Sequence, residues 1–127
     1  MAVPPEALEQ FLAEMKFAEA AWQRRGLNPS PPALCAKLEA MFNEVASKLM
    51  AESRVNAPRH VLKGVLTSFL STANRSDFDT EEAEFVCDEA ARLSRIVNVD
   101  VSTSLNRWLY GPILGTVVNL IRGRPRV

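Results

Sequence analysis

An apolar stripe in residues 32–52 is the feature that most constrains how this chain can fold. Its members recur every three or four residues and fall within an arc about 100° wide on a helical wheel. They are Leu34, Leu38, Met41, Phe42, Val45 and Leu49. A helix with one such face must bury it against other elements. We therefore expect residues 32–52 to form the central helix, with Leu38 and the three members that follow it fully buried.

The rest of the chain repeats this helical spacing between short breakers. One stripe runs from Pro5 to Arg24 and ends at RRGLNPSPP, where a glycine and three prolines stop a helix. Further helices are predicted for about residues 58–72, 79–97 and from Ser102 to Gly111, with an apolar continuation at 113–121. No segment shows the strict alternation of a half-buried strand. The sequence predicts an all-α fold, a single compact bundle of about five helices with no sheet.

Local signals predict helix ends and one close helix contact. Asp79, with Glu82 three residues later, has the spacing of a capping box. Asn56 is the expected N-cap of the helix at 58–72. Gly64 weakens that helix, which indicates a close helix crossing there. The 127 residues suffice for one helical domain, residues 1–127, with the basic tail 122–127 as a frayed terminus.

The charge balance and the cysteine content exclude several classes of protein. Lys+Arg and Asp+Glu number 15 each, so no net field attracts nucleic acid or an anionic membrane. The first residues, MAVPPE, lack the features of a signal peptide, and no run reaches the ~18 apolar residues of a membrane span. Cys35 and Cys87 form neither a disulfide framework nor a metal-binding spacing, and the exposure of Cys87 stays open. We expect a cytoplasmic protein.

Recognisable catalytic and cofactor motifs are missing from the sequence. His60 is the only histidine, and it falls opposite the apolar stripe of its helix, so we expect it at the surface. The five glycines are scattered and form no phosphate-binding loop. No nucleophile elbow, zinc-protease motif or calcium loop occurs. We therefore expect no enzyme, no cofactor and no metal site.

An acidic face on the helix at 79–97 is the strongest candidate for a binding surface. Glu81, Glu84 and Asp88 cover one outward side, and no Lys or Arg occurs between Arg75 and Arg92. The simpler interpretation is a solvated helix start whose charges suit the helix dipole. The functional interpretation is a docking face for a basic protein, with Phe78 or Phe85 as apolar anchor.

Glu89 lies inside the apolar arc of the same helix. A buried carboxylate must be paired or hydrogen-bonded, because an uncompensated charge in apolar surroundings is unstable. Arg107 and Arg92 are the candidate partners, and we expect a buried ion pair with Arg107. An interface or ligand contact is the alternative.

Aromatic residues outside the main stripes mark further surfaces. Trp108 and Tyr110, in the ending SLNRWLYGP, either lock the last helix into the bundle or line a second partner surface. Phe17 falls outside the stripe of the first predicted helix and is a candidate for a contact between copies of the chain.

The block FDTEEAEF and the later SLNRWLYG resemble a family of short bacterial helical proteins of unknown function. The resemblance covers about residues 75–111 and rests on an aromatic-acidic helix start and a terminal W-L-Y-G. It implies a bacterial, cytoplasmic, helical protein. The family has no established catalytic residues that could be transferred to this chain.

Two classes of function agree with these observations. The first is a protein that binds another protein through its acidic face. An immunity protein that inhibits a bacterial toxin with a basic domain is its most concrete form. The second is a helical regulatory or structural module without catalytic activity that works as a homo-oligomer, for which a homodimer is the simplest form.

Overall fold

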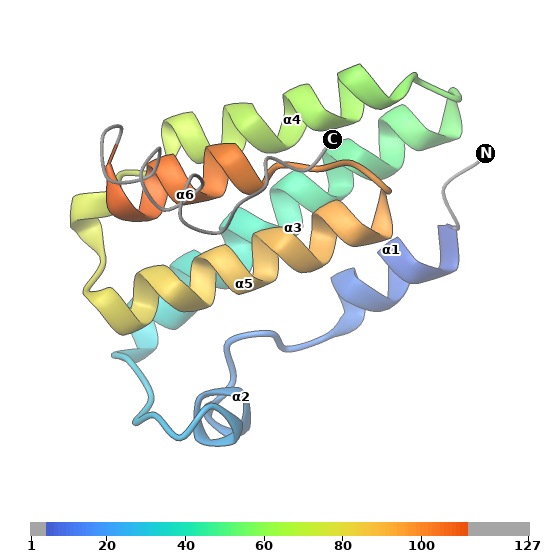
Figure 1. Ribbon diagram of the computed structural model, residues 1–127. Coiled ribbons are helices and arrows are strands. Elements are labelled where there is room, and N and C mark those ends of the chain that lie inside the picture. The colour runs from blue at the N-terminus through green and yellow to red at the C-terminus, as the bar shows by residue number, and fades with distance from the viewer. Residues whose placement is uncertain (1–4, 112–127) are drawn as a thin grey trace.

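The computed structural model describes residues 5–111, and within them all regular secondary structure is helical (Figure 1). The elements in chain order are α1 (Pro5–Ala13), α2 (Glu19–Arg24), α3 (Pro32–Arg54), α4 (Arg59–Thr72), the 3₁₀ turn η1 (Arg75–Asp77), α5 (Thr80–Ile96) and α6 (Ser102–Tyr110). The described part contains no strand, as predicted. The expected helical continuation at 113–121 and the tail 122–127 lie outside the described residues.

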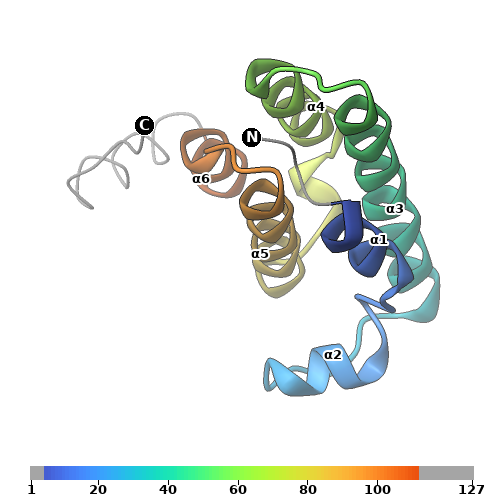
Figure 2. The same ribbon diagram turned by 90° about the vertical axis from the view of Figure 1, so that its right-hand side faces the viewer.

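The helices pack around one apolar core. The long α3 contacts α1 on one side and α4 on the other, while α5 contacts α1, α4 and α6. Viewed from the end, α1, α3 and α4 form an arc that α5 and α6 face (Figure 2). Aromatic rings fill the space between them, with Phe42 of α3 in contact with Phe11, Phe17 and Phe69. No helix of the described residues has both the length and the apolar character of a membrane span.

The prediction of one continuous helix from Pro5 to Arg24 is wrong, because the chain leaves helical geometry between α1 and α2. The break turns Phe17 inward, where its ring lies 5.5 Å from Phe42 and 4.7 Å from Phe85. Met15, in the same break, is 71% exposed. Phe17 is therefore a core residue and offers no surface for contact between copies. Burial of an aromatic ring outweighs the helical bonds lost at the break.

Lys16 holds this break together. Its side chain is fully buried, and its amine donates to the carbonyls of Phe11 at 2.9 Å and Glu14 at 3.1 Å and to the side-chain oxygen of Asn43 at 2.8 Å. A carboxylate oxygen of Glu39 lies 3.3 Å from the same amine. The amine thus satisfies backbone carbonyls at the end of α1 that have no partner within the helix.

The central helix matches its prediction except at one residue. Leu38, Phe42 and Val45 are buried as expected, whereas Met41 is only half-buried. The expected N-cap of α4 is also wrong, since Pro58 occupies that position and Asn56 adopts a left-handed turn with φ 55°. A Cβ placed on Gly64 would meet no atom within 4 Å, so no helix crosses closely there.

The capping box of α5 is confirmed. The Asp79 carboxylate accepts from the Glu82 N–H at 2.8 Å, and the Glu82 carboxylate accepts from the Asp79 N–H at 2.9 Å. The Ser30 hydroxyl also donates to Glu82 at 2.6 Å, which ties the loop before α3 to the start of α5. These bonds fix where the acidic face of α5 begins.

Candidate functional site

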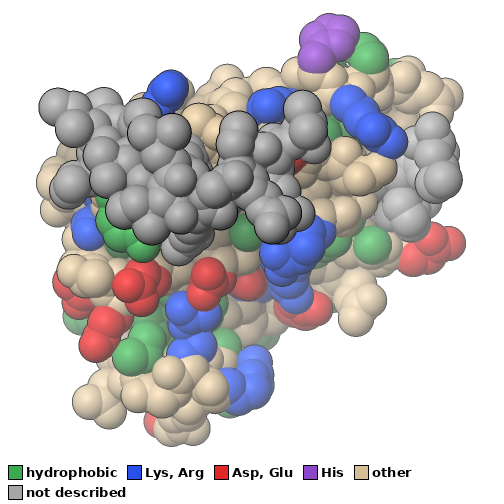
Figure 3. Space-filling view, in the orientation of Figure 1, with side chains coloured by type: hydrophobic (Ala, Val, Ile, Leu, Met, Phe, Trp, Pro, Cys, Tyr) green, Lys and Arg blue, Asp and Glu red, His purple; other side chains and the backbone are tan. Residues whose placement is uncertain are grey.

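The acidic face of α5 exists as predicted. Glu81, Glu84 and Asp88 are exposed, and acidic side chains follow the first half of α5 in Figure 3. Asp88 forms an ion pair of 2.7 Å with Arg25, which follows α2. Glu81 and Glu84 have no such partner among the described residues. The face therefore keeps unpaired negative charge toward solvent.

The prediction that Phe85 is an apolar anchor of this face is wrong, because only 4% of the residue is exposed to solvent. Its ring lies 4.7 Å from Phe17 and 4.8 Å from Trp22, and the Arg25 guanidinium covers it at 4.5 Å. A wheel of α5 alone places Phe85 at the edge of the polar side. The chain between α1 and α3 folds over that edge and encloses the ring.

Phe78 is likewise buried and cannot act as an exposed anchor. Its ring lies 6.1 Å from that of Trp108. The Trp108 indole donates a hydrogen bond of 2.8 Å to the carbonyl of Ala73. Trp108 therefore locks α6 against the α4–α5 connection, the first of the two roles expected for it. Arg75 reinforces the same corner by donating to the carbonyls of Phe78 and Leu109.

Tyr110 is the aromatic side chain that remains available near the acidic face. It is 39% exposed at the end of α6. Together with Leu105 and Leu109 it lines a hollow of about 320 Å³ between α5 and α6, which we call the α5–α6 hollow. Glu84 and Asp88 line the other side. The structure thus brings together two sequence candidates, the acidic face and Tyr110, that the sequence treated separately.

Cys87 also lines the α5–α6 hollow but is buried. Burial, followed by the negative charge of Asp88, raises the pKa of its thiol to about 12. The thiolate, which is the reactive form, is therefore scarce at neutral pH. Among the described residues no group of His, Cys, Asp and Glu is arranged to hold a metal ion. The exposed His60 lies apart from this hollow.

Glu89 is largely buried, as predicted, with 14% of its side chain exposed, but the prediction of Arg107 as its partner is wrong. The Arg92 guanidinium lies 3.1 Å from Glu89 and 2.6 Å from Glu14, and it stacks over the ring of Phe11 at 4.5 Å. Arg107 is exposed on α6. Glu89 and Arg92 are one helical turn apart, so the nearer arginine closes the pair.

The Glu89 carboxyl lines a polar hollow of about 370 Å³ between α5 and the break after α1. Burial raises its pKa above the ordinary value of 4.5, which the positive charge of Arg92 opposes and the negative charge of Glu14 supports. A perturbed carboxyl in a hollow is a mark of some active sites. The ion pair of Glu89 with Arg92, which also pairs with Glu14, joins α5 to the break after α1 and so has a structural role.

Replacement of Glu89 by Gln should change the pH dependence of stability. Because the folded state raises the pKa of Glu89, its favourable contribution is complete below the ordinary value of 4.5 and decreases as pH rises through the raised pKa. Relative to Glu89→Gln, the wild type should therefore lose stability over that interval. Urea unfolding of both proteins from pH 4 to 7 measures the difference. Parallel stability curves would contradict the prediction.

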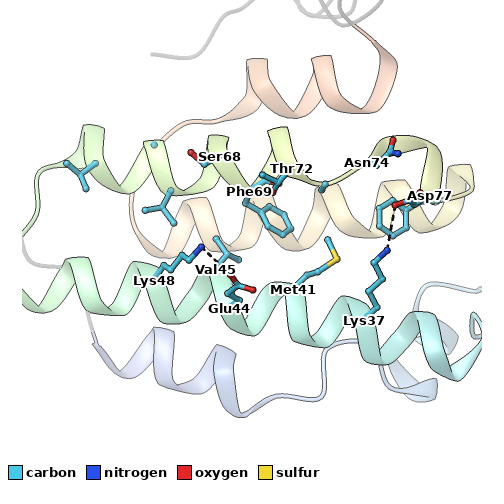
Figure 4. A pocket seen from close by; sticks show the side chains of 15 residues that line it. Lys37, Met41, Glu44, Val45, Lys48, Ser68, Phe69, Thr72, Asn74 and Asp77 are labelled. Carbon is cyan, nitrogen blue, oxygen red and sulfur yellow. Dashed lines mark hydrogen bonds and ion pairs between the residues drawn. The ribbon is translucent and has the colours of Figure 1, made fainter.

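A groove of about 680 Å³ between α3 and α4 was not predicted from the sequence. Figure 4 shows Met41, Val45 and Phe69 along its floor and ion pairs from α3 at two places along it. Lys37 pairs with Asp77 at 3.6 Å and Lys48 with Glu44 at 3.2 Å. The open space over Gly64 and the half-buried Met41 belong to this groove. Gly64 is the sequence signal for this open space, and the prediction of a close helix crossing there is wrong.

Comparison with known proteins defines the family. The model of the domain of unknown function DUF4844 matches residues 3–112, which includes every described helix. The chain belongs to the DUF4844 family. The resemblance seen at residues 75–111 thus extends over most of the chain, and the family is one of unknown function, as expected.

A solved structure supports the fold of this DUF4844 domain. The crystal structure of a DUF3571 family protein from Acinetobacter baumannii AYE is similar with a TM-score of 0.75 and 26% sequence identity. The similarity covers 90% of this chain and 94% of that one. No curated protein matches the sequence. The comparisons therefore define family and fold, and the candidate function rests on the surfaces described above.

Proposed function

We propose that the protein is a non-catalytic binding domain that takes a basic segment of another protein at the α5–α6 hollow. The observation that carries this proposal is the meeting of Glu84, Asp88 and the exposed Tyr110 around one hollow. An immunity protein that blocks a basic toxin domain is the concrete form we favour. A bacterial origin and a cytoplasmic location are parts of the same proposal.

The charges of the hollow select a cationic group. Glu84 is exposed and unpaired among the described residues, and Asp88 is shared with Arg25. Glu81 lies one turn before Glu84 and two turns before Asp88, and it extends the negative field along α5. Such a patch accelerates encounter with a basic partner and orients it.

The apolar side of the hollow supplies the contact that the buried Phe78 and Phe85 cannot. Leu105 and Leu109 are half-buried and present aliphatic surface, and the Tyr110 ring stands at the end of α6. An aromatic face attracts a Lys or Arg side chain, and the aliphatic stem of that side chain packs on leucine. At about 320 Å³ the hollow is at the small end of ligand pockets, which suits one or two side chains of a protein.

Charge reversal at Glu84 should weaken binding without unfolding the protein. We expect Glu84→Lys to slow association with the partner and Tyr110→Ala to speed its dissociation, by a factor of roughly 10 or more if Tyr110 is a hot spot. Glu9→Lys on α1 is the matched control, because Glu9 is exposed and lies outside the hollow. Partners co-purified from the native host are measured against the three variants by surface plasmon resonance.

Two outcomes would reject this assignment. Equal binding by wild type, Glu84→Lys and Tyr110→Ala, with all three folded by circular dichroism, would show that the hollow is merely solvated. A stable homodimer in light scattering that is unaffected by these variants would favour the homo-oligomeric module instead. The groove between α3 and α4 would then be the first surface to examine.

A further inference from the structure

Another hollow, of about 770 Å³, lies where α4 begins and α5 ends. We call it the basic hollow because Arg59, His60 and Lys63 of α4 and Arg95 of α5 line it. The remaining lining comes from the end of α5, the loop to α6 and the start of α6. Both helix ends lie on the same side of the bundle in Figure 1.

The cations of the basic hollow lack acidic partners. Among the described residues, Arg59, Lys63 and Arg95 form no ion pair, whereas several cations elsewhere on the described surface do. The sequence contains no Asp or Glu between Glu52 and Asp77. Like charges that face one hollow repel one another, and an anion between them removes that repulsion.

Arg59 and His60 stand in the first turn of α4, against its dipole. The first turn of α4 holds no acidic residue, and Pro58 provides no side-chain cap. The start of α5 is the opposite case, because Asp79, Glu81 and Glu82 complement its dipole. Positive side chains at a helix N-terminus are unfavourable on their own, while an anion there interacts with both the side chains and the free N–H groups.

Asp100, a carboxylate that also lines the basic hollow, has a defined role at the start of α6. One of its oxygens accepts from the N–H of Ser102 at 2.9 Å and from the Ser102 hydroxyl at 2.7 Å. Asp100 therefore serves as a cap for α6. The other charged side chains that line the hollow among the described residues are cationic or imidazole groups.

The hollow also has an apolar wall. Val99 and Leu105 are half-buried on the side of the loop and α6, and Val101 is buried beneath them. A simple inorganic anion would leave this wall uncovered. The combination of cations on one side and aliphatic side chains on the other suits a ligand with a phosphate at one end and a ring at the other.

We propose that the basic hollow binds a small phosphorylated molecule with a ring, of the size of a nucleotide. Arg59, Lys63 and Arg95 donate to the phosphate, and the ring packs on Val99 and Leu105. A small molecule is favoured over nucleic acid because the four basic side chains line one concave site and the chain as a whole has a net charge of +0. The basic hollow borders the α5–α6 hollow, and the two share Ala91, Ser102 and Leu105. Different charged side chains select the two ligands, so charge reversal at Lys63 or Arg95 tests this proposal without touching Glu84 or Asp88.

Titration of ¹⁵N-labelled full chain with adenosine monophosphate, pyrophosphate and adenosine tests this proposal. Adenosine monophosphate should shift the amide resonances of His60, Lys63 and Asn98 in a saturable way. Pyrophosphate should shift those of Lys63 and Arg95 but not those of Val99 and Leu105 at the apolar wall. Adenosine should bind at least about tenfold more weakly than its monophosphate, because it lacks the charge-assisted bonds. Added salt should weaken the binding of the two anions and leave the affinity for adenosine unchanged.

Two charge reversals and one control complete the test. The variants Lys63→Glu and Arg95→Glu should each lower the affinity for adenosine monophosphate at least about tenfold. Arg107→Glu makes the same charge change at an exposed residue outside the hollow, and it should change affinity less than about twofold. Circular dichroism checks that each variant is folded. Absence of saturable shifts, equal weakening by Arg107→Glu, or binding of an oligonucleotide without binding of the monophosphate would each overturn the proposal.

Discussion

Replacement of Phe42 by Ala is expected to lower the free energy of unfolding by about 3–5 kcal/mol. Phe42 is 0% exposed, and its ring lies 5.0 Å from Phe69, 5.5 Å from Phe17 and 6.4 Å from Phe11. These rings come from α1, α4 and the break after α1, so the cavity would open where three segments meet. Rigid helices on all sides cannot collapse into it, which places the loss at the upper end for such changes.

Met41→Ala is the matched control, since Met41 is the adjacent residue on α3 but lines the open groove. Its side chain is half-buried, so the loss should be less than half of that for Phe42→Ala. Urea unfolding followed by circular dichroism measures both. Equal losses would mean that the groove is filled in solution, and a Phe42→Ala protein as stable as wild type would remove Phe42 from the core.

The sequence predicted well those features that one helix determines by itself. The bounds of α3 and α5, the capping box at Asp79 and the inward stripe around Phe42 depend on spacing of three or four residues and on local hydrogen bonds. Such signals are contained within a few turns of chain. The same holds for the outward position of Glu81, Glu84 and Asp88, which the structure confirms.

Features that depend on what covers a helix were predicted poorly. Phe17 and Phe85 are on the margins of their own wheels, yet they contact each other and Trp22 in the core. The cause is the segment between α1 and α3, in which only the short α2 is helical. This segment covers one side of α5. No periodicity within α5 records this cover, and tertiary packing overrides the local pattern.

The net charge of the whole chain likewise does not show how the charged side chains are distributed over the surface. Equal numbers of acids and bases excluded a strong general attraction to nucleic acid. That argument concerns the field at a distance, which salt screens beyond about 10 Å. It leaves room for an acidic face on α5 and a basic hollow at the start of α4, because each acts at contact distance. Both proposals depend on this segregation.

Lys16 was missed altogether, and its replacement should have the second large effect on stability. Lys16→Met keeps the length of the side chain but removes an amine that donates to two carbonyls and Asn43 and pairs with Glu39. Glu39 is then left as a largely buried carboxylate whose other oxygen accepts from the N–H of Phe17. Removal of one partner of a buried pair typically costs about 3–5 kcal/mol, so we expect a loss of about 3 kcal/mol.

Glu39→Gln in the Lys16→Met background separates the stranded charge from the lost hydrogen bonds. Gln can still accept from Phe17 but carries no charge, so the double variant should be more stable than Lys16→Met alone. Lys48→Met is the control, because Lys48 and Glu44 form an exposed pair whose loss should be within about 0.5 kcal/mol. Urea unfolding of wild type, Lys16→Met, Glu39→Gln and the double variant measures the cycle, and Lys48→Met is unfolded beside them as the control. Additive losses at Lys16 and Glu39 would show that the two charges do not interact, and the break after α1 would then be held by the burial of Phe17 alone.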